Sequence, residues 1–212
     1  PSGTVIDEET LEYLINKANT FDFWLASDEC YSEIYRNTPP PGLLEVCAQM
    51  GHRDYRQCLV FHSLSKRSNL PGLRSGFVAG DASFIAPFLK YRTYHGCSMS
   101  MAVQKASELA WSDEDHVIVN RGLYAEKFQA AADILGEQLD SHDPGAGFYL
   151  WAKTPTGCDT FSRDLYAATG VTVLPGQFLG REVDGVNPGA GFVRMALVAE
   201  PDTCREALLR IQ

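Results

Sequence analysis

The sequence predicts an α/β fold, and two kinds of pattern support this prediction. Short apolar runs bounded by turn residues, such as Cys58–His62, predict buried strands. Between these runs lie longer stretches whose apolar residues recur at helical spacing. Because strands that alternate with helices usually form one layered sheet, we expect an α/β sheet that is largely parallel. With 212 residues, 45% of them hydrophobic, the chain can fill a substantial core.

The first half of the chain is predicted to alternate between helix and strand. Residues 7–19 place apolar side chains on one helical face behind an acidic first turn, so they predict an amphipathic helix. Residues 82–111 also have a helical pattern, but it is interrupted near His95 and Gly96, which predicts two helices. The other expected elements are a strand at 21–27, a short helix at 43–50, and strands at 58–62 and 75–80.

The second half begins with a long predicted helix at 113–139, with Ser112 or Asp113 as its N-cap. The chain changes character near Pro144. The elements expected after it are a strand at 146–152, a helix at 159–170 closed by Gly170, strands at 171–176 and 191–197, and a last helix at 201–211. We place a domain change within the long helix and predict that residues 1–115 and 116–212 belong to different domains.

Composition argues against several classes of function. The balance of 18 basic and 27 acidic residues gives a net charge of −9, which opposes binding to nucleic acids and anionic lipids. No apolar run approaches the roughly 20 residues that span a bilayer, and the first residues do not resemble a signal peptide. Six cysteines without a C-x-x-C pair, and histidines without metal-ligand spacing, predict neither a metal site nor a disulfide framework. We expect a cytoplasmic protein.

Chemically capable side chains recur at predicted strand ends and turns. By itself, a carboxylate at the end of a strand most often caps a helix or pairs with a cation. An arginine inside an apolar strand, in contrast, needs an anionic partner from the protein or from a ligand. The candidate residues are Asp28 and Tyr31 in SDECY, Ser63, Ser65 and Lys66 in SLSK, Arg74 in PGLRSG, and Arg194 in GFVRMAL.

Together these side chains match the polar groups of one cofactor, pyridoxal 5'-phosphate. A desolvated amine such as that of Lys66 can form a Schiff base with an aldehyde. Serine hydroxyls and the planar fork of Arg74 suit a phosphate ester. Asp28 could stabilise a protonated ring nitrogen, and Tyr31 could donate to a phenolate oxygen. Arg194 then remains available for the carboxylate of a substrate.

The motifs SDECY, SLSK followed by PGLRSG, and GFVRMAL resemble those of the class I/II (fold type I) pyridoxal-phosphate aminotransferases, and the opening PSG resembles the end of their NPxNPSG turn. More narrowly, ASDECYSEIY, VFHSLSKRSNLPGLRSGFVAGD, YRTYHGC and GFYLW resemble N-succinyldiaminopimelate aminotransferases of bacterial lysine biosynthesis. This resemblance implies that residues 1–115 are the C-terminal part of a large, mostly parallel-sheet domain that binds the cofactor. Residues 116–212 would be the linking helix and a small α+β domain.

The resemblance also implies a role for each candidate residue. Lys66 would hold the cofactor covalently and later move a proton between the substrate and the cofactor, while Asp28 would pair with the pyridine nitrogen and Tyr31 would hydrogen-bond O3′. Two further residues, Ser63 and Arg74, match the phosphate-binding positions.

Three more polar residues complete this comparison. Ser65 lies next to the phosphate-binding positions, and we count it among the cofactor-binding residues. Arg194 matches the arginine that binds the α-carboxylate of the substrate. For Arg67 the resemblance implies no role, and a structural ion pair is an equally good interpretation.

The implied reaction is amino transfer between N-succinyl-LL-2,6-diaminopimelate and 2-oxoglutarate in a homodimeric enzyme. Tyr91, Arg92, Tyr94 and His95 are candidate contacts for a long substrate, although aromatic residues at helical spacing more often belong to a core. Because the chain opens in a turn and lacks the family's glycine-containing phosphate loop, ring-stacking aromatic residue and NPxNPSG asparagine, we expect an N-terminally truncated fragment. We expect this fragment to be inactive alone.

Other interpretations are weaker. A different class I/II aminotransferase, with aspartate or an aromatic amino acid as substrate, would carry the same motifs. A non-catalytic, aminotransferase-like sensor module would not need the lysine, the aspartate and both arginines. Ser63 and Lys66 also satisfy S-x-x-K, the nucleophile motif of β-lactamases. That chemistry needs both residues on one helix, whereas here a predicted strand precedes Ser63 and Pro71 follows closely.

Overall fold

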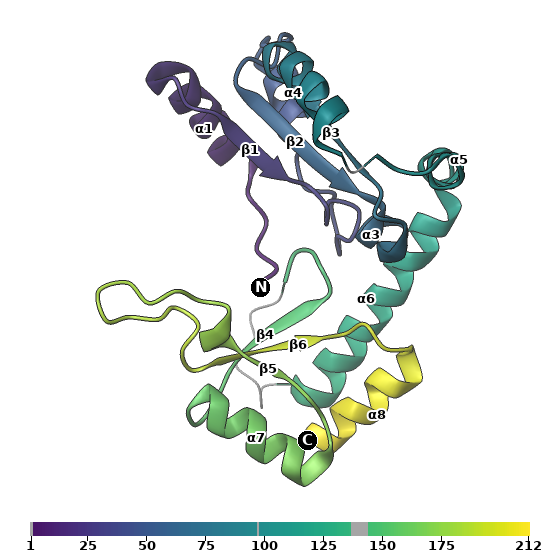
Figure 1. Cartoon of the computed structure of the whole chain (residues 1–212). Coiled ribbons are helices and arrows are strands. Elements are labelled where there is room, and N and C mark those ends of the chain that lie inside the picture. Colours follow the sequence, from purple (N-terminus) through teal and green to yellow (C-terminus); the bar gives the residue numbers. More distant parts are fainter. Residues whose placement is uncertain (1, 97, 137–143) are drawn as a thin grey trace. The chain divides into compact units, whose positions relative to one another are not determined.

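The structure is a computed structural model that describes residues 2–96, 98–136 and 144–212 (Figure 1). The chain forms two compact units. We call Val5–Asn120 the lysine unit, and Pro1–Thr4 together with Arg121–Gln212 the arginine unit. Among the described residues, no helix combines the length and the apolar character needed to cross a membrane.

The lysine unit is built on a three-stranded sheet in the order β1-β2-β3. Its strands are β1 (Leu25–Asp28), β2 (Cys58–Ser63) and β3 (Gly76–Gly80). Strands β1 and β2 are parallel, as predicted, whereas β3 runs antiparallel to β2. The expectation of a largely parallel sheet is therefore wrong for β3, because the chain turns back after β2 and the Leu64 N–H donates to the Ser75 carbonyl at 3.1 Å.

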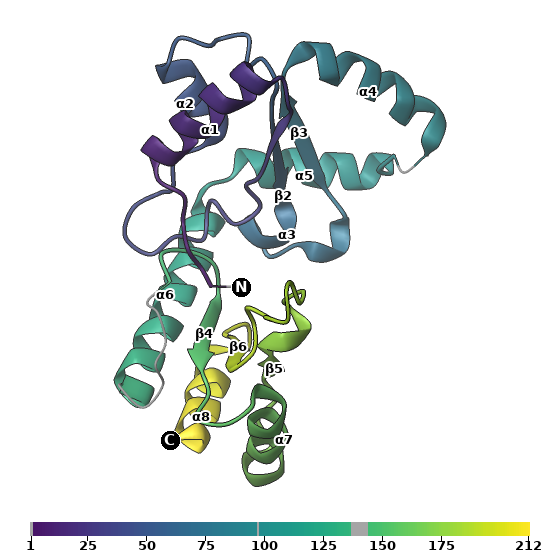
Figure 2. The ribbon, with the colours of Figure 1, turned by 90° about the vertical axis from the view of Figure 1, so that its left-hand side faces the viewer.

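Two helices cover one face of this sheet, α1 (Glu8–Phe21) and α2 (Leu43–Gln49) (Figure 2). Asp7 caps α1, since its carboxylate accepts a hydrogen bond from the Thr10 N–H at 2.8 Å. Helix α1 is longer than predicted and β1 begins later, because the chain continues helically up to the left-handed Asp22. The buried core between these helices and the sheet comprises Leu11, Ile15, Leu43, Val46, Cys47, Cys58 and Val60.

The remaining helices follow the predicted order. The predicted interruption near residue 95 is confirmed, since it separates α4 (Ala82–His95) from α5 (Met101–Ser112). The long helix α6 is Asp115–Leu135, and the Asp113 carboxylate accepts from the Asp115 N–H at its start, at 3.0 Å. The predicted end of this helix at residues 137–139 lies outside the described residues. Two short turns, α3 (Leu64–Arg67) and η1 (Pro71–Leu73), connect β2 to β3.

The arginine unit has an antiparallel sheet in the order β4-β6-β5, with helices against one face (Figure 1). Its further elements are β4 (Tyr149–Lys153), α7 (Cys158–Thr169), β5 (Leu174–Pro175), η3 (Gly176–Phe178), β6 (Phe192–Ala196) and α8 (Pro201–Ile211). Strand β5 is shorter than predicted, because Pro175 lacks the N–H that would extend the ladder and Gly176 begins η3.

The core of the arginine unit lies on one face of its sheet. Leu150, Ala152, Val193 and Met195 alternate with half-exposed neighbours along β4 and β6 and point to this face. They pack against buried side chains from α6, α7 and α8, among them Phe128, Ala131, Cys158 and Leu208. The opposite face of the sheet carries Tyr149, Trp151, Phe192 and Arg194.

Replacing either of two glycines of the arginine unit by alanine should change the free energy of unfolding, but in opposite directions. Gly170 ends α7 in the left-handed region at φ 72°, whereas Gly122 is exposed inside α6, and a Cβ would meet no atom within 4 Å at either site. Gly170→Ala should lower the free energy of unfolding by about 1 kcal/mol because of backbone strain. Gly122→Ala should raise it by about 0.5–1 kcal/mol through helix propensity. Urea denaturation of both variants measures the two shifts, and equal shifts of one sign would contradict the prediction.

Candidate active site

The candidate residues of the lysine unit gather at one edge of its sheet. Strands β1 and β2 are parallel, with Asp28 paired with Phe61, so their carboxyl ends meet at the same edge. The Glu29 N–H donates to the Phe61 carbonyl at 2.9 Å and extends the pairing to the end of β1. Lys66 lies in α3, three residues after Ser63, the last residue of β2. The prediction that Lys66 lies near the carboxyl end of a strand is confirmed.

Lys66, Asp28 and Tyr31 surround one small region of this edge. The Lys66 ammonium lies 5.8 Å from the centre of the Tyr31 ring. The Asp28 carboxylate accepts a hydrogen bond from the Cys30 N–H at 3.1 Å. Asp28 and Lys66 both act electrostatically on the Cys30 thiol, which places both charges near this side chain. The structure therefore brings together an amine, a carboxylate and a phenol.

Cys30 also lies at this site, although it is not among the residues predicted from the sequence. Burial raises the pKa of the Cys30 thiol to about 12; a hydrogen bond with Asp28 and the Asp28 charge act in the same direction, and Lys66 opposes them. The thiol is therefore neutral at physiological pH. The sequence feature that could have identified Cys30 is its position between Asp28 and Tyr31 in SDECY.

Serine hydroxyls lie at the end of β2 and directly after it. The Ser63 Oγ accepts a hydrogen bond from the Ser65 N–H at 3.1 Å and caps α3, and it lies 2.9 Å from the Ser65 Oγ. It also lies 3.1 Å from the Ser75 carbonyl oxygen. The Ser75 hydroxyl in turn accepts from the buried Ser107 hydroxyl of α5, at 2.8 Å. Ser75 and Ser107 thus hold the returning chain beside Ser63, a role that the sequence pattern did not reveal.

Arg74 ends the turn that returns to β3. Its backbone is left-handed, with φ 52°, and its guanidinium donates to the Pro71 carbonyl at 2.8 Å. Arg74 is exposed and precedes the buried Ser75 directly. Charged and hydroxyl donors on one short loop are suited to a phosphate group, so Ser63, Ser65 and Arg74 fit the phosphate of the predicted cofactor.

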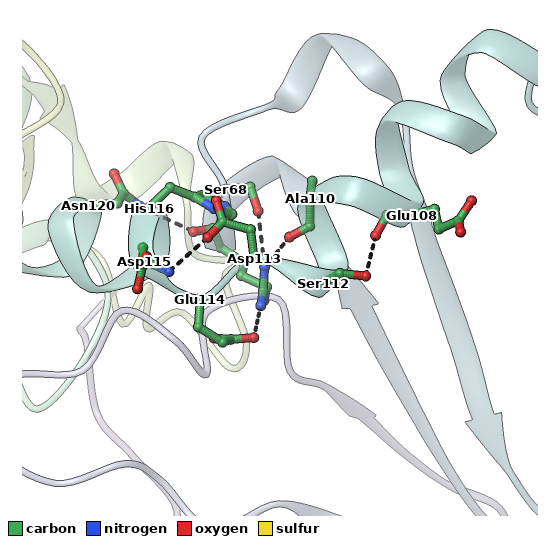
Figure 3. A network of polar contacts seen from close by, with 10 residues as sticks. Ser68, Glu108, Ala110, Ser112, Asp113, Glu114, Asp115, His116 and Asn120 are labelled. Atoms are coloured by element: carbon green, nitrogen blue, oxygen red, sulfur yellow. Dashed lines mark hydrogen bonds and ion pairs between the residues drawn. The ribbon is translucent and has the colours of Figure 1, made fainter.

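Arg67 has a structural role. Its side chain is buried and donates to the Ala110 carbonyl at 2.8 Å and to the Ser68 hydroxyl at 3.3 Å (Figure 3). It also forms an ion pair with Glu114, and the guanidinium carbon lies 5.1 Å from the centre of the Trp111 ring. These contacts occupy the guanidinium from several sides, which favours the ion-pair interpretation of Arg67 over a role in binding the cofactor.

A contact between a carboxylate and an imidazole lies beside the candidate residues. The Glu29 carboxylate is 3.2 Å from the His62 Nε2 and accepts a hydrogen bond from the Leu43 N–H at 2.8 Å. Burial alone would raise the pKa of Glu29, but the hydrogen bonds from His62 and Leu43 outweigh it, so the pKa is lowered. Glu29 is therefore ionised at neutral pH and ties the chain after β1 to both β2 and α2.

Arg194 lies in the arginine unit, in the middle of β6. It is paired with Trp151 across the ladder, and its guanidinium carbon is 4.3 Å from the centre of the Tyr149 ring. Within the described chain, the buried Arg194 Nε has no hydrogen-bond partner. Leaving a buried donor unpaired costs about 1–3 kcal/mol, and more for a charged group, so this nitrogen fits an anionic ligand.

The aromatic residues of YRTYHGC are exposed in the lysine unit. Tyr91 is 56% exposed and Tyr94 84%, and the rings of Tyr91 and His95 are 4.7 Å apart. In the structure of this unit, the core interpretation is therefore wrong for both tyrosines. Their contact with a substrate stays a prediction.

A cavity of about 610 Å³ lies at the opposite edge of the sheet, and it contains none of the predicted site residues. Polar groups in its lining already pair with one another. The Asp81 carboxylate accepts from the N–H groups of Gln57 and Ser83, each at 2.7 Å, and the Gln57 side chain donates to Asp22 at 2.6 Å. The chemistry therefore points to the edge that carries Lys66 and not to this cavity.

Comparisons with known proteins agree on one family. Residues 1–211 match the family "Aminotransferase class I and II". An aminotransferase structure from Neisseria meningitidis Z2491 is 51% identical with a TM-score of 0.93, and the match covers 100% of this chain and 54% of that one.

Two curated relatives match the whole chain with lower identity. A "Probable aminotransferase" of Mycobacterium tuberculosis is 33% identical, and the match covers 49% of its length. The LL-diaminopimelate aminotransferase of Maridesulfovibrio salexigens is 31% identical, with 53% of its length covered. The chain thus spans about half the length of these curated relatives.

The environment of Cys30 predicts slow alkylation of its thiol. With a pKa of about 12, only about one thiol in ten thousand is ionised at pH 8, so iodoacetamide should modify Cys30 at least about a hundredfold more slowly than free cysteine. Asp28→Asn should speed the reaction, because it removes a neighbouring negative charge, whereas Glu8→Gln in the first turn of α1 should not. Peptide mapping by mass spectrometry measures the rates, and modification of Cys30 as fast as free cysteine would refute the prediction.

Proposed function

Since this chain belongs to the class I and II aminotransferase family, we propose that its residues form part of the active site of a pyridoxal-phosphate-dependent aminotransferase. The observation that carries the proposal is the grouping of Asp28, Tyr31 and Lys66 at the carboxyl edge of β1 and β2. Because the chain spans about half the length of its curated relatives, the proposed activity is that of the enzyme that contains these residues.

Lys66, Asp28 and Tyr31 have distinct proposed tasks. When bound, pyridoxal phosphate supplies an aldehyde and an electron-withdrawing ring. The Lys66 amine would hold this group covalently until the amine of the substrate replaces it, and the released amine would then move the proton at the substrate's α-carbon. The Asp28 carboxylate keeps the ring nitrogen protonated, and the Tyr31 hydroxyl donates to the ring oxygen. The neutral Cys30 thiol adds no charge between them.

Four further residues bind the two anionic groups in this proposal. Ser63, Ser65 and Arg74 hold the phosphate, since their donors lie at the end of β2 and in the two short turns that connect it to β3. Arg194 binds the α-carboxylate of the amino acid and of the 2-oxo acid in turn. Its buried, unpartnered Nε and its contact with the Tyr149 ring support this role. One arginine can serve both half-reactions because both substrates carry the same carboxylate.

We propose N-succinyl-LL-2,6-diaminopimelate as the amino donor and 2-oxoglutarate as the acceptor, in a homodimeric enzyme. The motifs ASDECYSEIY and YRTYHGC support this choice, as does the name of the relative that acts as an LL-diaminopimelate aminotransferase. The exposed Tyr91 and Tyr94 are available for contact with a long substrate or with a second subunit.

The substrate proposal is tested on the whole enzyme that contains this chain. With 2-oxoglutarate as acceptor, kcat/KM for N-succinyl-LL-2,6-diaminopimelate should exceed that for LL-diaminopimelate, aspartate and phenylalanine by at least about tenfold. Lys66→Ala should abolish turnover, because it removes the amine that holds the cofactor and moves the proton. A preference for aspartate or phenylalanine would refute the substrate and leave the family intact. Cofactor binding without any turnover would instead favour a sensor.

A second prediction concerns residues 1–212 purified alone. They should show no measurable amino transfer, because the family's glycine-containing phosphate loop and ring-stacking aromatic residue are not in this sequence. The measurement is 2-oxoglutarate-dependent turnover at saturating pyridoxal phosphate, with the whole enzyme as the control. Turnover by these residues alone at a rate near that of the whole enzyme would contradict the expectation.

A further inference from the structure

The helical turn that carries Lys66 is too short to satisfy its own carbonyl groups. Helix α3 is only four residues long, and the last carbonyls of any helix have no partner within it. The Leu64 carbonyl accepts from the N–H groups of Ser68 and Leu70, at 3.1 and 3.2 Å. The carbonyls of Lys66 and Arg67 instead meet a side chain far along the chain.

That side chain is Asn120 of α6. Its Nδ2 donates to the Lys66 carbonyl at 3.2 Å and to the Arg67 carbonyl at 3.4 Å. Figure 3 shows Asn120 on α6 beside this turn. A side-chain amide nitrogen has two hydrogens, so one group can serve both carbonyls. Asn120 is half-buried, which limits competition from water for these bonds.

Residues at the end of α5 and before α6 also hold α3, through the side chain of Arg67. Arg67, the residue after Lys66, is buried against Ala110 at the end of α5 and against Glu114 just before α6. Arg67 therefore fixes α3 through its side chain, whereas Asn120 fixes it through the backbone. Of these contacts, only the one from Asn120 reaches the peptide group of Lys66 itself.

We infer that Asn120 is a positioning residue for Lys66. A lysine side chain is long and flexible, so the place of its amine depends on how firmly its backbone is held. By holding the Lys66 carbonyl, Asn120 sets the origin from which the side chain reaches toward Tyr31. Displacement of the reacting groups by about 1 Å can lower a rate a hundredfold. This inference rests on the proposed function, because it assumes that the Lys66 amine is the reacting group.

The test compares three variants of the cofactor-loaded whole enzyme. Asn120→Asp keeps the size of the side chain but replaces both donors with a carboxylate that faces two carbonyls. Asn120→Ala removes the donors without adding charge and suits a helix better than asparagine. Asn16→Asp makes the same chemical change on the exposed side of α1 and is the matched control.

Four quantities are measured: kcat, KM, the thermal midpoint, and the pH at which the visible absorption of the bound cofactor changes form. Both Asn120 variants should lower kcat about tenfold or more, with KM changed less than about twofold. Both should also shift the spectroscopic midpoint by about half a pH unit or more. The alanine variant adds no charge. If its spectroscopic midpoint shifts as well, the shift reports a changed position of Lys66 and not only the charge that Asn120→Asp introduces. Asn16→Asp should match the unchanged enzyme.

Two results would overturn the inference. One is that the Asn120 variants match Asn16→Asp in kcat and in the spectroscopic midpoint. The other is a lowered thermal midpoint with kcat and the spectrum unchanged, which would make Asn120 a purely structural residue. Failure of the proposed function is seen separately, in the unchanged enzyme and Lys66→Ala. The unchanged enzyme should show a visible absorption band of the bound cofactor that is absent from Lys66→Ala. If it shows no such band, both the proposed function and the role of Asn120 are wrong.

Discussion

The parallel pairing of β1 with β2 is the constraint on which the candidate site depends. It aligns Asp28 with Phe61 and brings the ends of both strands to one edge, so that the SDECY and SLSK segments meet there. Cys58 and Val60 of β2 belong to the core under α1 and α2, whereas Leu59 and Phe61 alternate with them and lie on the other face of the strand. A slip of one residue would exchange the two faces of β2. The core under α1 and α2 therefore also determines where the chemistry is placed.

Strand β3 adds the second constraint. Because it returns antiparallel, with Gly76 opposite Ser63, Arg74 and Ser75 end beside the start of α3. A Cβ on Gly76 would lie 2.4 Å from the His62 carbonyl oxygen, so only glycine permits this close approach. The buried hydrogen bond between Ser75 and Ser107 then attaches the returning chain to α5. Backbone pairing and neutral hydroxyl groups thus hold the segment that carries Arg74. The charged side chain of Arg74 is not needed for this and is exposed.

The sequence predicts those features that depend on local pattern. The strand before Ser63, the break between α4 and α5 and the end of α7 at Gly170 all follow from apolar runs and turn residues close in the chain. The direction of β3 could not be predicted in this way, because it depends on a bond that joins Leu64 to Ser75. The roles of Ser107 and Asn120 were missed for the same reason. Their partners lie 32 and 54 residues away, and neither residue stands in a motif.

Two arginines, one buried and one half-buried, show most clearly where prediction from sequence ends. Arg67 stands beside Lys66 in the most suggestive motif of the chain, whereas Arg194 lies alone in an apolar strand. A buried nitrogen of a guanidinium needs a hydrogen-bond partner in either place. Arg67 is compensated from within its own unit by Ala110, Ser68 and Glu114. The Arg194 Nε, in contrast, is buried without a hydrogen-bond partner among the described residues. The partners, and not the motif, therefore separate an arginine that holds the fold from one that is suited to bind a substrate.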